Sequence, residues 1–234
     1  MSSSNKILST PQNLQVLFED NHIVIVNKRS GDIVQGDKTG DTPLSDVVKA
    51  YIKNKYNKPG NVYLGVIHRL DRPTTGIVIF AKTSKSLSRL NKIFADKKVR
   101  KTYWAVVKQR PSKTADTLIH WLKKNTKNNK SFAHHKEIKD SKKAILHYKI
   151  IKSLDRYYLL EINLETGRHH QIRCQLSSIG ASIKGDLKYG FDRSNKDASI
   201  HLHSRKIEFT HPVSKVKITV TAPTPKDVIW DACL

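Results

Sequence analysis

Asp71 is the residue of this sequence whose surroundings best suit a chemical role. It stands between Arg69 and Arg72 in a turn-forming stretch that leads into an apolar run at residues 77–80. Functional groups tend to lie on loops that a rigid scaffold positions. A neighbouring guanidinium also favours the charged form of a carboxyl, which an aspartate that acts as a nucleophile requires. The same residues fit a solvated aspartate in a Pro-Thr-Gly turn, so other segments must decide between the two readings.

A second cluster of polar residues begins at Thr166-Gly167-Arg168 and continues through His170-Gln171-Ile172-Arg173. Gly167 can turn the chain out of a strand, and the helix that follows would offer free N–H groups at its start. Arg168 and Arg173 could bind phosphate, or Arg173 could point at a buried carboxylate. A basic helix face with ordinary surface histidines is the alternative. The glycine-punctuated segment 180–190 matches neither a Walker loop nor a dinucleotide fingerprint, and by itself indicates only a turn.

Hydrophobic periodicity predicts the elements that would position these residues. Two short apolar runs, 14–18 and 22–27, predict a hairpin, and further strands are predicted from alternation or continuous apolar character. Helices are predicted where apolar residues recur at helical spacing, the first with Thr42 as N-cap and Pro43 in its first turn. The further strands are 76–82, 102–107, 144–152 and 157–164, with alternation again over 201–221, and the helices are 44–52, 87–94 and 168–179.

These elements predict an α+β fold, with a mixed, mainly antiparallel central sheet flanked by helices and loops, because strands outnumber helices without a regular βαβ rhythm. We expect a polar arm at residues 1–13 and a single catalytic domain over residues 14–234. Residues 123–143 hold eight lysines and few apolar residues. They read as a solvated insertion or an RNA-facing loop.

The charge of the chain points to a polyanionic partner. Lys and Arg number 43 against 20 Asp and Glu, a formal net charge of +23. Nucleic acid is the leading class and an anionic membrane surface the second, although no amphipathic anchor or lipidation signal is found. The two cysteines offer at most one disulfide and no metal-ligand spacing. With no apolar signal or membrane-spanning run, we expect a soluble, cytoplasmic protein without membrane association.

Taken together and in order, several segments resemble the RluA type of RNA pseudouridine synthases. The resemblance runs from about residue 14 to residue 223, nearly the whole chain. The segments are Val26-Asn27-Lys28-Arg29-Ser30-Gly31, His68-Arg69-Leu70-Asp71 with Thr74-Thr75-Gly76, Lys101-Thr102-Tyr103-Trp104-Ala105, Thr166-Gly167-Arg168 with His170-Gln171-Ile172-Arg173, Gly185-Asp186 with Tyr189-Gly190, and His203 with Phe209, His211 and Pro212.

The resemblance implies an isomerase that converts uridine in structured rRNA or tRNA into pseudouridine. The family's essential aspartate falls on Asp71, which would attack the base or the sugar, or assist a glycal route, after the uridine has flipped out of its stack. Arg69 resembles the residue that fills the vacated space, and Tyr103 the tyrosine that lies against the uracil. Arg173 resembles the arginine that pairs with the aspartate. We expect His68, Arg168 and Ile172 to join Arg69 in substrate binding.

The reaction is a redox-neutral isomerisation, so the resemblance implies no cofactor or metal, and we expect a monomer without an obligate protein partner. Arg29 replaces the family's usual proline and Thr75 its usual serine. Only 13 residues precede the first predicted strand, so we expect no S4-type RNA-binding domain. Grip on the RNA must then come from the catalytic domain's own basic surface, for which residues 123–143 are a candidate.

Other classes of function remain open at this point. A non-catalytic RNA-binding or ribosome-associated protein would explain the charge, but would not need Asp71, Tyr103 and Arg173 to converge. Glycoside hydrolysis usually requires two carboxylates, and the clearest second candidate is Asp186. A metal site could be built from His134-His135 or from His201-Leu202-His203.

Overall fold

The computed structural model describes residues 7–234, which form two compact units. Unit 1 contains residues 7–101 and Ser204–Pro225, and unit 2 contains Thr102–His203 and Lys226–Leu234. Both units are therefore discontinuous in sequence. Residues 1–6 of the predicted N-terminal arm lie outside the described residues. The rest of the arm is tied to unit 1 at Ser9, whose N–H and hydroxyl donate hydrogen bonds of 3.0 and 2.6 Å to the carboxylate of Asp32.

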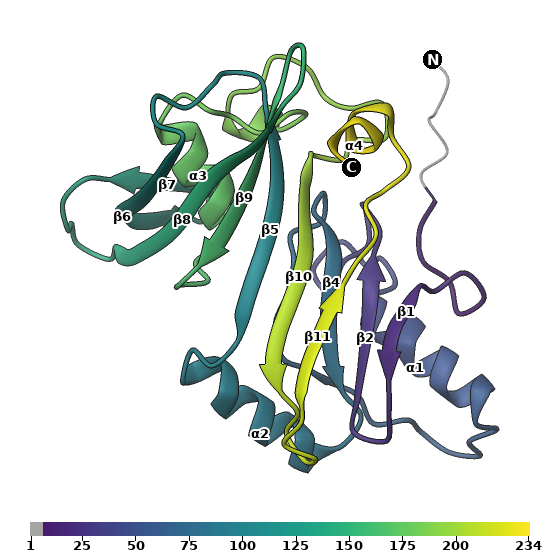
Figure 1. Cartoon of the computed structure of the whole chain (residues 1–234). Coiled ribbons are helices and arrows are strands. Elements are labelled where there is room, and N and C mark those ends of the chain that lie inside the picture. Colours follow the sequence, from purple (N-terminus) through teal and green to yellow (C-terminus); the bar gives the residue numbers. More distant parts are fainter. Residues whose placement is uncertain (1–6) are drawn as a thin grey trace. The chain divides into compact units, whose positions relative to one another are not determined.

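Unit 1 is built on a mixed sheet with one helix against each face, because its strand pairs are antiparallel except β4 and β10, which run in the same direction (Figure 1). Strand neighbours run in the order β1, β2, β4, β10, with β3 on β4 and β11 on β10 (Figure 1). The predicted hairpin is present as β1 and β2. The elements are β1 (Val16–Glu19), β2 (Ile23–Lys28), α1 (Leu44–Lys55), β3 (Gly65–Val66), β4 (Thr75–Ala81), α2 (Ser84–Ala95), β10 (Leu202–Thr210) and β11 (Lys217–Thr221), and the first residues of β5 (Arg100–Val107) also belong here.

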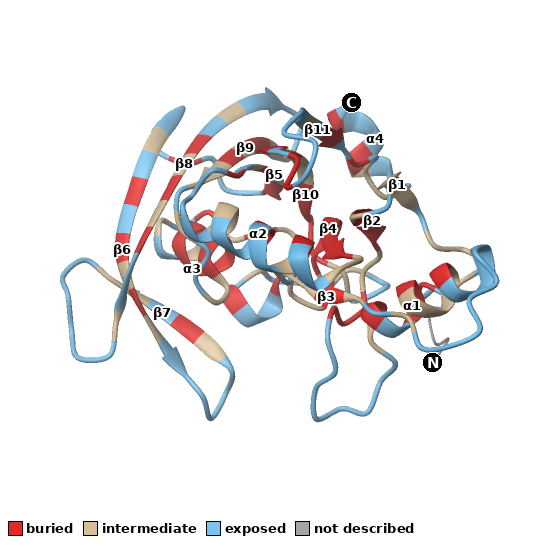
Figure 2. Ribbon diagram, turned by 90° about the horizontal axis from the view of Figure 1, so that it is seen from below, coloured by how far each residue is buried: buried red, intermediate tan, exposed pale blue. Residues whose placement is uncertain are grey.

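The two central strands of unit 1 are buried on both faces. Ile23 and Ile25 of β2 pack in the cluster that contains Leu90 of α2. Val24 and Val26, the alternating residues, pack in the cluster that contains Val48 of α1. All of β2 and β4 is buried, and both strands appear in red in Figure 2. This two-sided burial explains why their sequences are continuously apolar rather than alternating.

Helix α1 begins differently from the prediction. Its N-cap is Pro43, which has no side chain that could accept a hydrogen bond, and Thr42 precedes the cap. Instead, the first helical N–H groups donate to the backbone: Leu44 to the carbonyl of Ile33 at 2.7 Å and Ser45 to that of Val34 at 3.2 Å. Backbone carbonyls of residues 33 and 34 thus accept the hydrogen bonds of the first N–H groups, a role that a capping side chain usually has.

The strands of unit 2 pair in the order β5, β9, β8, β6, β7, and every neighbouring pair is antiparallel. Helix α3 packs against β6 and β7. Helix α4 packs against β5 and β9, in a cluster that contains Val106, Leu159 and Trp230. The elements are β5, β6 (Ala115–Asn125), β7 (Lys130–His134), β8 (Lys142–Ser153), β9 (Tyr158–Leu164), α3 (Gln171–Ser178), the short 3₁₀ helix η1 (Leu187–Tyr189) and α4 (Val228–Cys233).

Two local predictions differ from the structure of unit 2. Residues 123–143 are not a loop throughout, because residues 130–134 form β7, which pairs with β6. Helix α3 begins at Gln171 rather than at Arg168, because His170 has a φ of 52°, in the left-handed region, which cannot form part of a right-handed helix. The predicted α+β class with a mainly antiparallel sheet is confirmed. No helix of residues 7–234 is long and apolar enough to cross a membrane.

Candidate active site

Asp71 lies in a tight turn whose backbone carbonyls accept hydrogen bonds from a buried lysine. The carbonyl of Asp71 accepts a 3.0 Å hydrogen bond from the N–H of Thr74, which closes the turn. The ammonium of Lys28, at the end of β2, donates to the carbonyls of Arg72 at 3.0 Å and Thr74 at 2.7 Å, and also to that of Arg29 at 2.9 Å. Lys28 is only 1% exposed. Its ammonium therefore fixes the positions of the carbonyls on the C-terminal side of Asp71, and so the orientation of the backbone that carries the Asp71 carboxylate.

Gly76 explains how the turn enters strand β4 so abruptly. Its φ is +108°, and a Cβ atom built there would lie 2.4 Å from the carbonyl oxygen of Ser204 on the neighbouring strand β10. Any side chain would collide with backbone, so only glycine permits this close approach. The glycine of the Thr74-Thr75-Gly76 motif is therefore required by geometry.

The two arginines beside Asp71 have different surroundings. Arg72 donates to the carboxylate of Asp41 at 2.6 Å and to the hydroxyl of Thr39 at 2.9 Å, so it anchors the loop at residues 37–41. Arg69 is exposed. Across residues 7–234 its guanidinium forms neither a hydrogen bond nor an ion pair. The guanidinium of Arg72 is thus engaged by the loop at residues 37–41, whereas that of Arg69 is available to a ligand.

His68 is built into the support of the turn. Its Nε2 accepts a 3.1 Å hydrogen bond from the N–H of Ile79 on β4, and its ring stacks on Phe94 of α2 with centroids 5.3 Å apart. Burial, with a smaller contribution from the charge of Lys101, lowers the pKa of His68 to about 3. The neutral ring therefore joins the turn to β4 and α2. Its predicted part in substrate binding stays a prediction.

Arg29 stands where the resemblance leads one to expect proline, and the structure shows which contacts it forms there. The backbone N–H of Arg29 donates a 3.2 Å hydrogen bond to the carboxylate of Asp32, a bond that proline could not form. Its guanidinium donates to the carbonyl of Asn13 at 3.2 Å. The backbone and the side chain of Arg29 thus both take part in the local turn, and its carbonyl shares the ammonium of Lys28 with the Asp71 turn.

The other predicted site residues belong to unit 2. Tyr103 lies on β5 opposite Ile162 and is 7% exposed. Side-chain alternation across the paired strands puts it on the face that α3 covers. Ile172, 5% exposed, and Arg173 are both on α3. Unit 2 thus brings Tyr103 and Arg173 to one face of its sheet, while Asp71 belongs to unit 1. Their convergence stays a prediction.

Arg173 forms a buried bidentate ion pair with Asp186. Its Nε and Nη2 donate to the two carboxylate oxygens at 2.7 and 2.8 Å. The side chains are 6% and 1% exposed, so the pair is shielded from solvent. Both oxygens of Asp186 serve this pairing, which makes it a support for Arg173 and a poor candidate for the second carboxylate of a glycosidase. The buried carboxylate suggested by the sequence as a partner of Arg173 is thus present.

Gln171 shapes the turn that precedes α3. Its Oε1 accepts hydrogen bonds from the N–H of Arg168 at 2.9 Å and from the hydroxyl of Thr166 at 2.8 Å. Its Nε2 donates to the carbonyl of Ile145 on β8 at 3.0 Å. These bonds replace helical ones and delay the start of α3. Arg168 is exposed, and its Nε donates to the carbonyl of Lys143 at 3.0 Å.

Tyr189 was quoted only as part of a motif, yet it ties several segments of unit 2 together. Its hydroxyl accepts from the N–H of Ser131 on β7 at 2.8 Å and is 3.0 Å from Nδ1 of His170. The guanidinium carbon of Arg173 lies 5.0 Å from its ring centroid. Burial is the main cause that raises the pKa of Tyr189 far above its ordinary value. The neutral phenol therefore packs beneath Arg173 and links it to the lysine-rich segment.

His201, one of the histidines considered as metal ligands, has a carboxylate and an aromatic ring as neighbours. His201 is 2.9 Å from the carboxylate of Asp227 and stacks on Trp230. Among residues 7–234, no group of three or more His, Cys, Asp or Glu side chains could hold a metal ion.

Comparison with known proteins identifies the family. Residues 22–178, which include Lys28, Asp71, Tyr103 and Arg173, match the family described as RNA pseudouridylate synthase. The chain belongs to this family. Its enzymes are isomerases that act on RNA, and the resemblance found in the sequence is confirmed.

Individual relatives agree with the family. The chain is 32% identical to the ribosomal large subunit pseudouridine synthase D of Zymomonas mobilis, over 92% of this chain and 70% of the relative. It is 34% identical to the ribosomal large subunit pseudouridine synthase C of Buchnera aphidicola, over 94% of this chain and 70% of the relative.

Solved structures agree with the fold. Human RNA pseudouridylate synthase domain containing 4 superposes with a TM-score of 0.77 at 22% identity, over 94% of this chain and 92% of that one. Human RNA pseudouridylate synthase domain containing 1 gives 0.75 at 20% identity, over 97% and 90%. The fold of this RNA pseudouridylate synthase is therefore that of known family members.

Proposed function

We propose that this pseudouridylate synthase isomerises uridine in large-subunit ribosomal RNA and that the carboxylate of Asp71 carries the chemistry. The observation that supports this most is the Asp71 turn, held by the buried ammonium of Lys28 and followed by a glycine that no other residue can replace. A catalytic group needs such rigid support to keep the correct orientation towards the reacting atoms. The names of the relatives from Zymomonas and Buchnera favour the large ribosomal subunit.

The proposed reaction balances without any co-reactant. The bond between C1′ of the ribose and N1 of uracil breaks, the uracil rotates, and a bond between C1′ and C5 forms. The proton on C5 leaves and N1 gains one, so the product is an isomer of the substrate. Asp71 attacks the base or the sugar, or takes a proton on a glycal route. Each of these roles requires it as a carboxylate.

Other residues are proposed to prepare the uridine for Asp71. A stacked base must flip out, at a cost of about a few kcal/mol. The exposed guanidinium of Arg69 is suited to fill the vacated space, since a planar cation can stack and contact phosphate together. Tyr103 would lie against the uracil and receive the C5 proton, while Arg173, braced by Asp186, would pair with Asp71. His68, Arg168 and Ile172 complete the proposed substrate-binding set.

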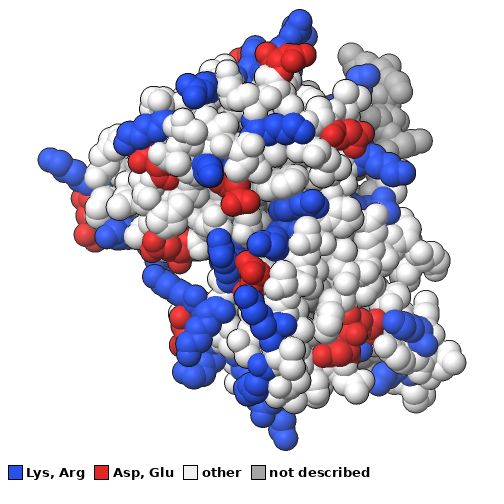
Figure 3. All heavy atoms as spheres, viewed as in Figure 1, with Lys and Arg blue, Asp and Glu red and all other residues white. Residues whose placement is uncertain are grey.

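The charge of the surface fits an RNA substrate. Figure 3 shows Lys and Arg side chains spread over the visible face, interspersed with fewer acidic ones, in keeping with the net charge of +23. Phosphate contacts of this kind supply affinity without sequence information. Transfer RNA is therefore the alternative substrate, and the same assay must include it.

Asp71→Asn tests the proposal because it preserves the shape of the side chain and removes its charge. Large-subunit ribosomal RNA and transfer RNA labelled with tritium at C5 of uridine would be incubated with the purified protein, and tritium release measured. We expect release from the ribosomal RNA with the natural protein and at least about a 10³-fold slower release with Asp71→Asn. Pseudouridine mapping on the same RNA would locate the product.

Asp46→Asn is the matched control, since Asp46 is an exposed aspartate of unit 1 whose carboxylate, among residues 7–234, forms an ion pair only with Lys49. It should release tritium at the natural rate. Undiminished release by a folded Asp71→Asn variant would refute the role of Asp71. Release from transfer RNA alone would refute the ribosomal substrate and leave the reaction standing.

A further inference from the structure

One face of the unit 2 sheet carries aromatic and basic side chains that the proposed reaction does not use. On β6, His120 and Leu122 are 4% and 5% exposed and face α3. The alternating residues point the other way, and Figure 2 shows the resulting bands along β6. We call this side the outer face of β6–β8, and it is formed by Ile119, Trp121, Lys123, Phe132 and Lys143.

The register of the strands interleaves rings with cations on this outer face. Trp121 of β6 is directly opposite Lys143 of β8, and Phe132 of β7 is directly opposite Lys123 of β6. The ammonium of Lys143 lies 5.8 Å from the centroid of the Trp121 ring. That of Lys130 lies 5.7 Å from the centroid of Phe132. Rings and charges thus alternate across three adjacent strands.

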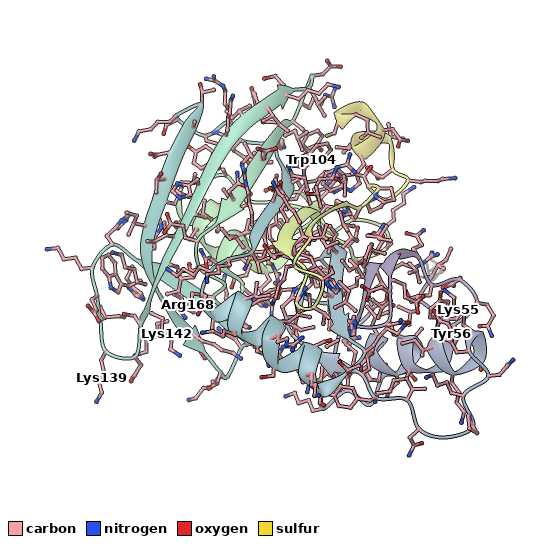
Figure 4. The ribbon with its side chains drawn as sticks, turned by 60° about the horizontal axis from the view of Figure 1, so that its bottom comes forward. Lys55, Tyr56, Trp104, Lys139, Lys142 and Arg168 are labelled. Carbon is pink, nitrogen blue, oxygen red and sulfur yellow. The ribbon has the colours of Figure 1, made fainter. Side chains whose placement is uncertain are left out.

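The outer face is open where these rings lie. Phe132 is 43% exposed and Ile119 is 45% exposed, so no described element covers them. At the other end of the same face, Trp104 of β5 packs in the cluster formed with Trp230 of α4 (Figure 4). The apolar surface near α4 therefore has its partner within unit 2, whereas the surface around Trp121 and Phe132 has none among residues 7–234.

We propose that the outer face of β6–β8 binds an unpaired stretch of the RNA substrate, whose bases stack on Trp121 and Phe132 while its phosphates meet the neighbouring lysines. A sheet face with rings flanked by cations suits single-stranded RNA, because every base has a π-face that can stack on an aromatic side chain. This inference rests on the proposed function for the identity of the substrate, but its geometry is independent of Asp71.

The charges around the outer face favour an RNA over an apolar partner. Arg168 and Lys139 lie along one edge in Figure 4, where the Nε of Arg168 donates to the carbonyl of Lys143. Asp140, 3.7 Å from Lys123, is 70% exposed, and Glu165, 2.7 Å from Nε2 of His147, is 45% exposed, so solvent screens both carboxylates. A protein partner for a basic, half-apolar face would have to be acidic, and the RNA that the family acts on already supplies that charge.

The test uses the whole protein chain. It compares the affinity for a single-stranded oligouridylate of about twelve nucleotides with the affinity for an RNA duplex of the same length. Trp121→Leu with Phe132→Leu keeps apolar bulk but removes the rings. We expect this double variant to bind the single strand at least about tenfold more weakly and the duplex within about twofold of the natural protein. Trp121→Phe with Phe132→Tyr keeps stacking and should restore single-strand affinity.

Two further measurements sharpen the result. Stacking should quench the emission of Trp121 when the oligonucleotide binds, and Trp121→Phe should remove that part of the signal. Lys143→Gln should lower the slope of log affinity against log salt by about 0.7, as expected for one lost phosphate contact on a single strand. Tyr63→Leu is the control, because Tyr63 is 46% exposed but belongs to unit 1 and is not part of the outer face.

The proposal is overturned if the ring-deleting double variant binds the single strand within about twofold of the natural protein, or if Tyr63→Leu weakens it equally. It is also overturned if single strand and duplex are weakened alike, since phosphate binding alone would explain that. Binding of phosphatidylserine vesicles that the double variant loses while retaining oligouridylate would assign the face to membranes. Failure of the natural protein to release tritium, with stacking intact, would refute the proposed function and not the outer face.

Discussion

Lys28→Met is the most informative perturbation of the Asp71 turn. Methionine has a similar length and fills the same buried space, but it cannot donate the three hydrogen bonds that Lys28 gives to the carbonyls of Arg29, Arg72 and Thr74. Those carbonyls would lose their donor on the side that Lys28 occupies. The change therefore separates the charge of Lys28 from its packing.

The magnitude follows from those three bonds. A hydrogen bond from a charged group contributes about 1.5–3 kcal/mol, so the gross loss is about 4.5–9 kcal/mol. Removing the ammonium also relieves the cost of burying a charge, which is several kcal/mol. We expect a net loss of about 3 kcal/mol, a large share of the roughly 5–15 kcal/mol of a typical domain. A turn displaced by about 1 Å would in addition slow catalysis about 100-fold.

Urea unfolding measures the first quantity, and tritium release at a temperature where the variant is fully folded measures the second. Lys85→Met, an exposed lysine on α2, controls for the loss of one positive charge and should change stability by less than about 0.5 kcal/mol. If Lys28→Met unfolds within about 1 kcal/mol of the natural protein and releases tritium at the same rate, then the ammonium of Lys28 does not hold the turn.

Two further predictions concern ion pairs. Asp186→Asn breaks the buried bidentate pair with Arg173 and should cost about 3 kcal/mol or more in urea unfolding. Asp192→Asn, whose side chain is 68% exposed, should be nearly neutral, and equal effects would contradict the reasoning. Although burial opposes it, hydrogen bonds from Lys55 and Lys82 lower the pKa of Glu19 from 4.5 to about 2. A lowered carboxyl pKa stabilises the fold above pH 4.5, and this stabilisation is lost as the pH falls towards 2. Glu19→Gln should therefore destabilise the protein by about 1–2 kcal/mol at pH 7, a value reduced by the exposure of Lys55, and the difference should shrink at pH 3. A difference that grows towards low pH would contradict this assignment.

Several elements were predictable because their burial leaves a plain pattern. Strands β2 and β4 are buried on both faces and read as apolar runs, and α2 shows Leu87, Leu90, Ile93 and Phe94 at helical spacing. No strand was predicted over residues 115–125, although β6 lies there. Its outer face carries the apolar Ile119 and Trp121 and its buried face carries the polar His120, which hides the alternation. The six residues of α4 are too few for a helical period to show.

The site was predictable in its residue types but not in its supports. Asp71 stood out through its neighbours and the order of the motifs. The role of Lys28 depends on carbonyls 44 and 46 residues further along the chain, and no local pattern encodes that contact. The sequence suggested a buried carboxylate near Arg173 and the resemblance named Asp71 as its partner; the ion pair with Asp186 required the fold, and the pairing with Asp71 stays a prediction. Contacts across long stretches of sequence are the part that only a structure supplies.

The discontinuity of the two units bears on how the chain is made. Synthesis is directional, so residues 7–101 leave the ribosome long before Ser204–Pro225 supply β10 and β11 to the same unit. Unit 2 is completed later still, because Asp227 must be made before it can pair with His201, and Trp230 before it can cover Val106 and Leu159. Until then the growing chain carries an unfinished sheet edge and bare apolar surface, which are features that favour aggregation. Emergence of residues 226–233 is therefore the step that completes unit 2, and a chain cut before Lys226 would be a target for chaperones and proteases.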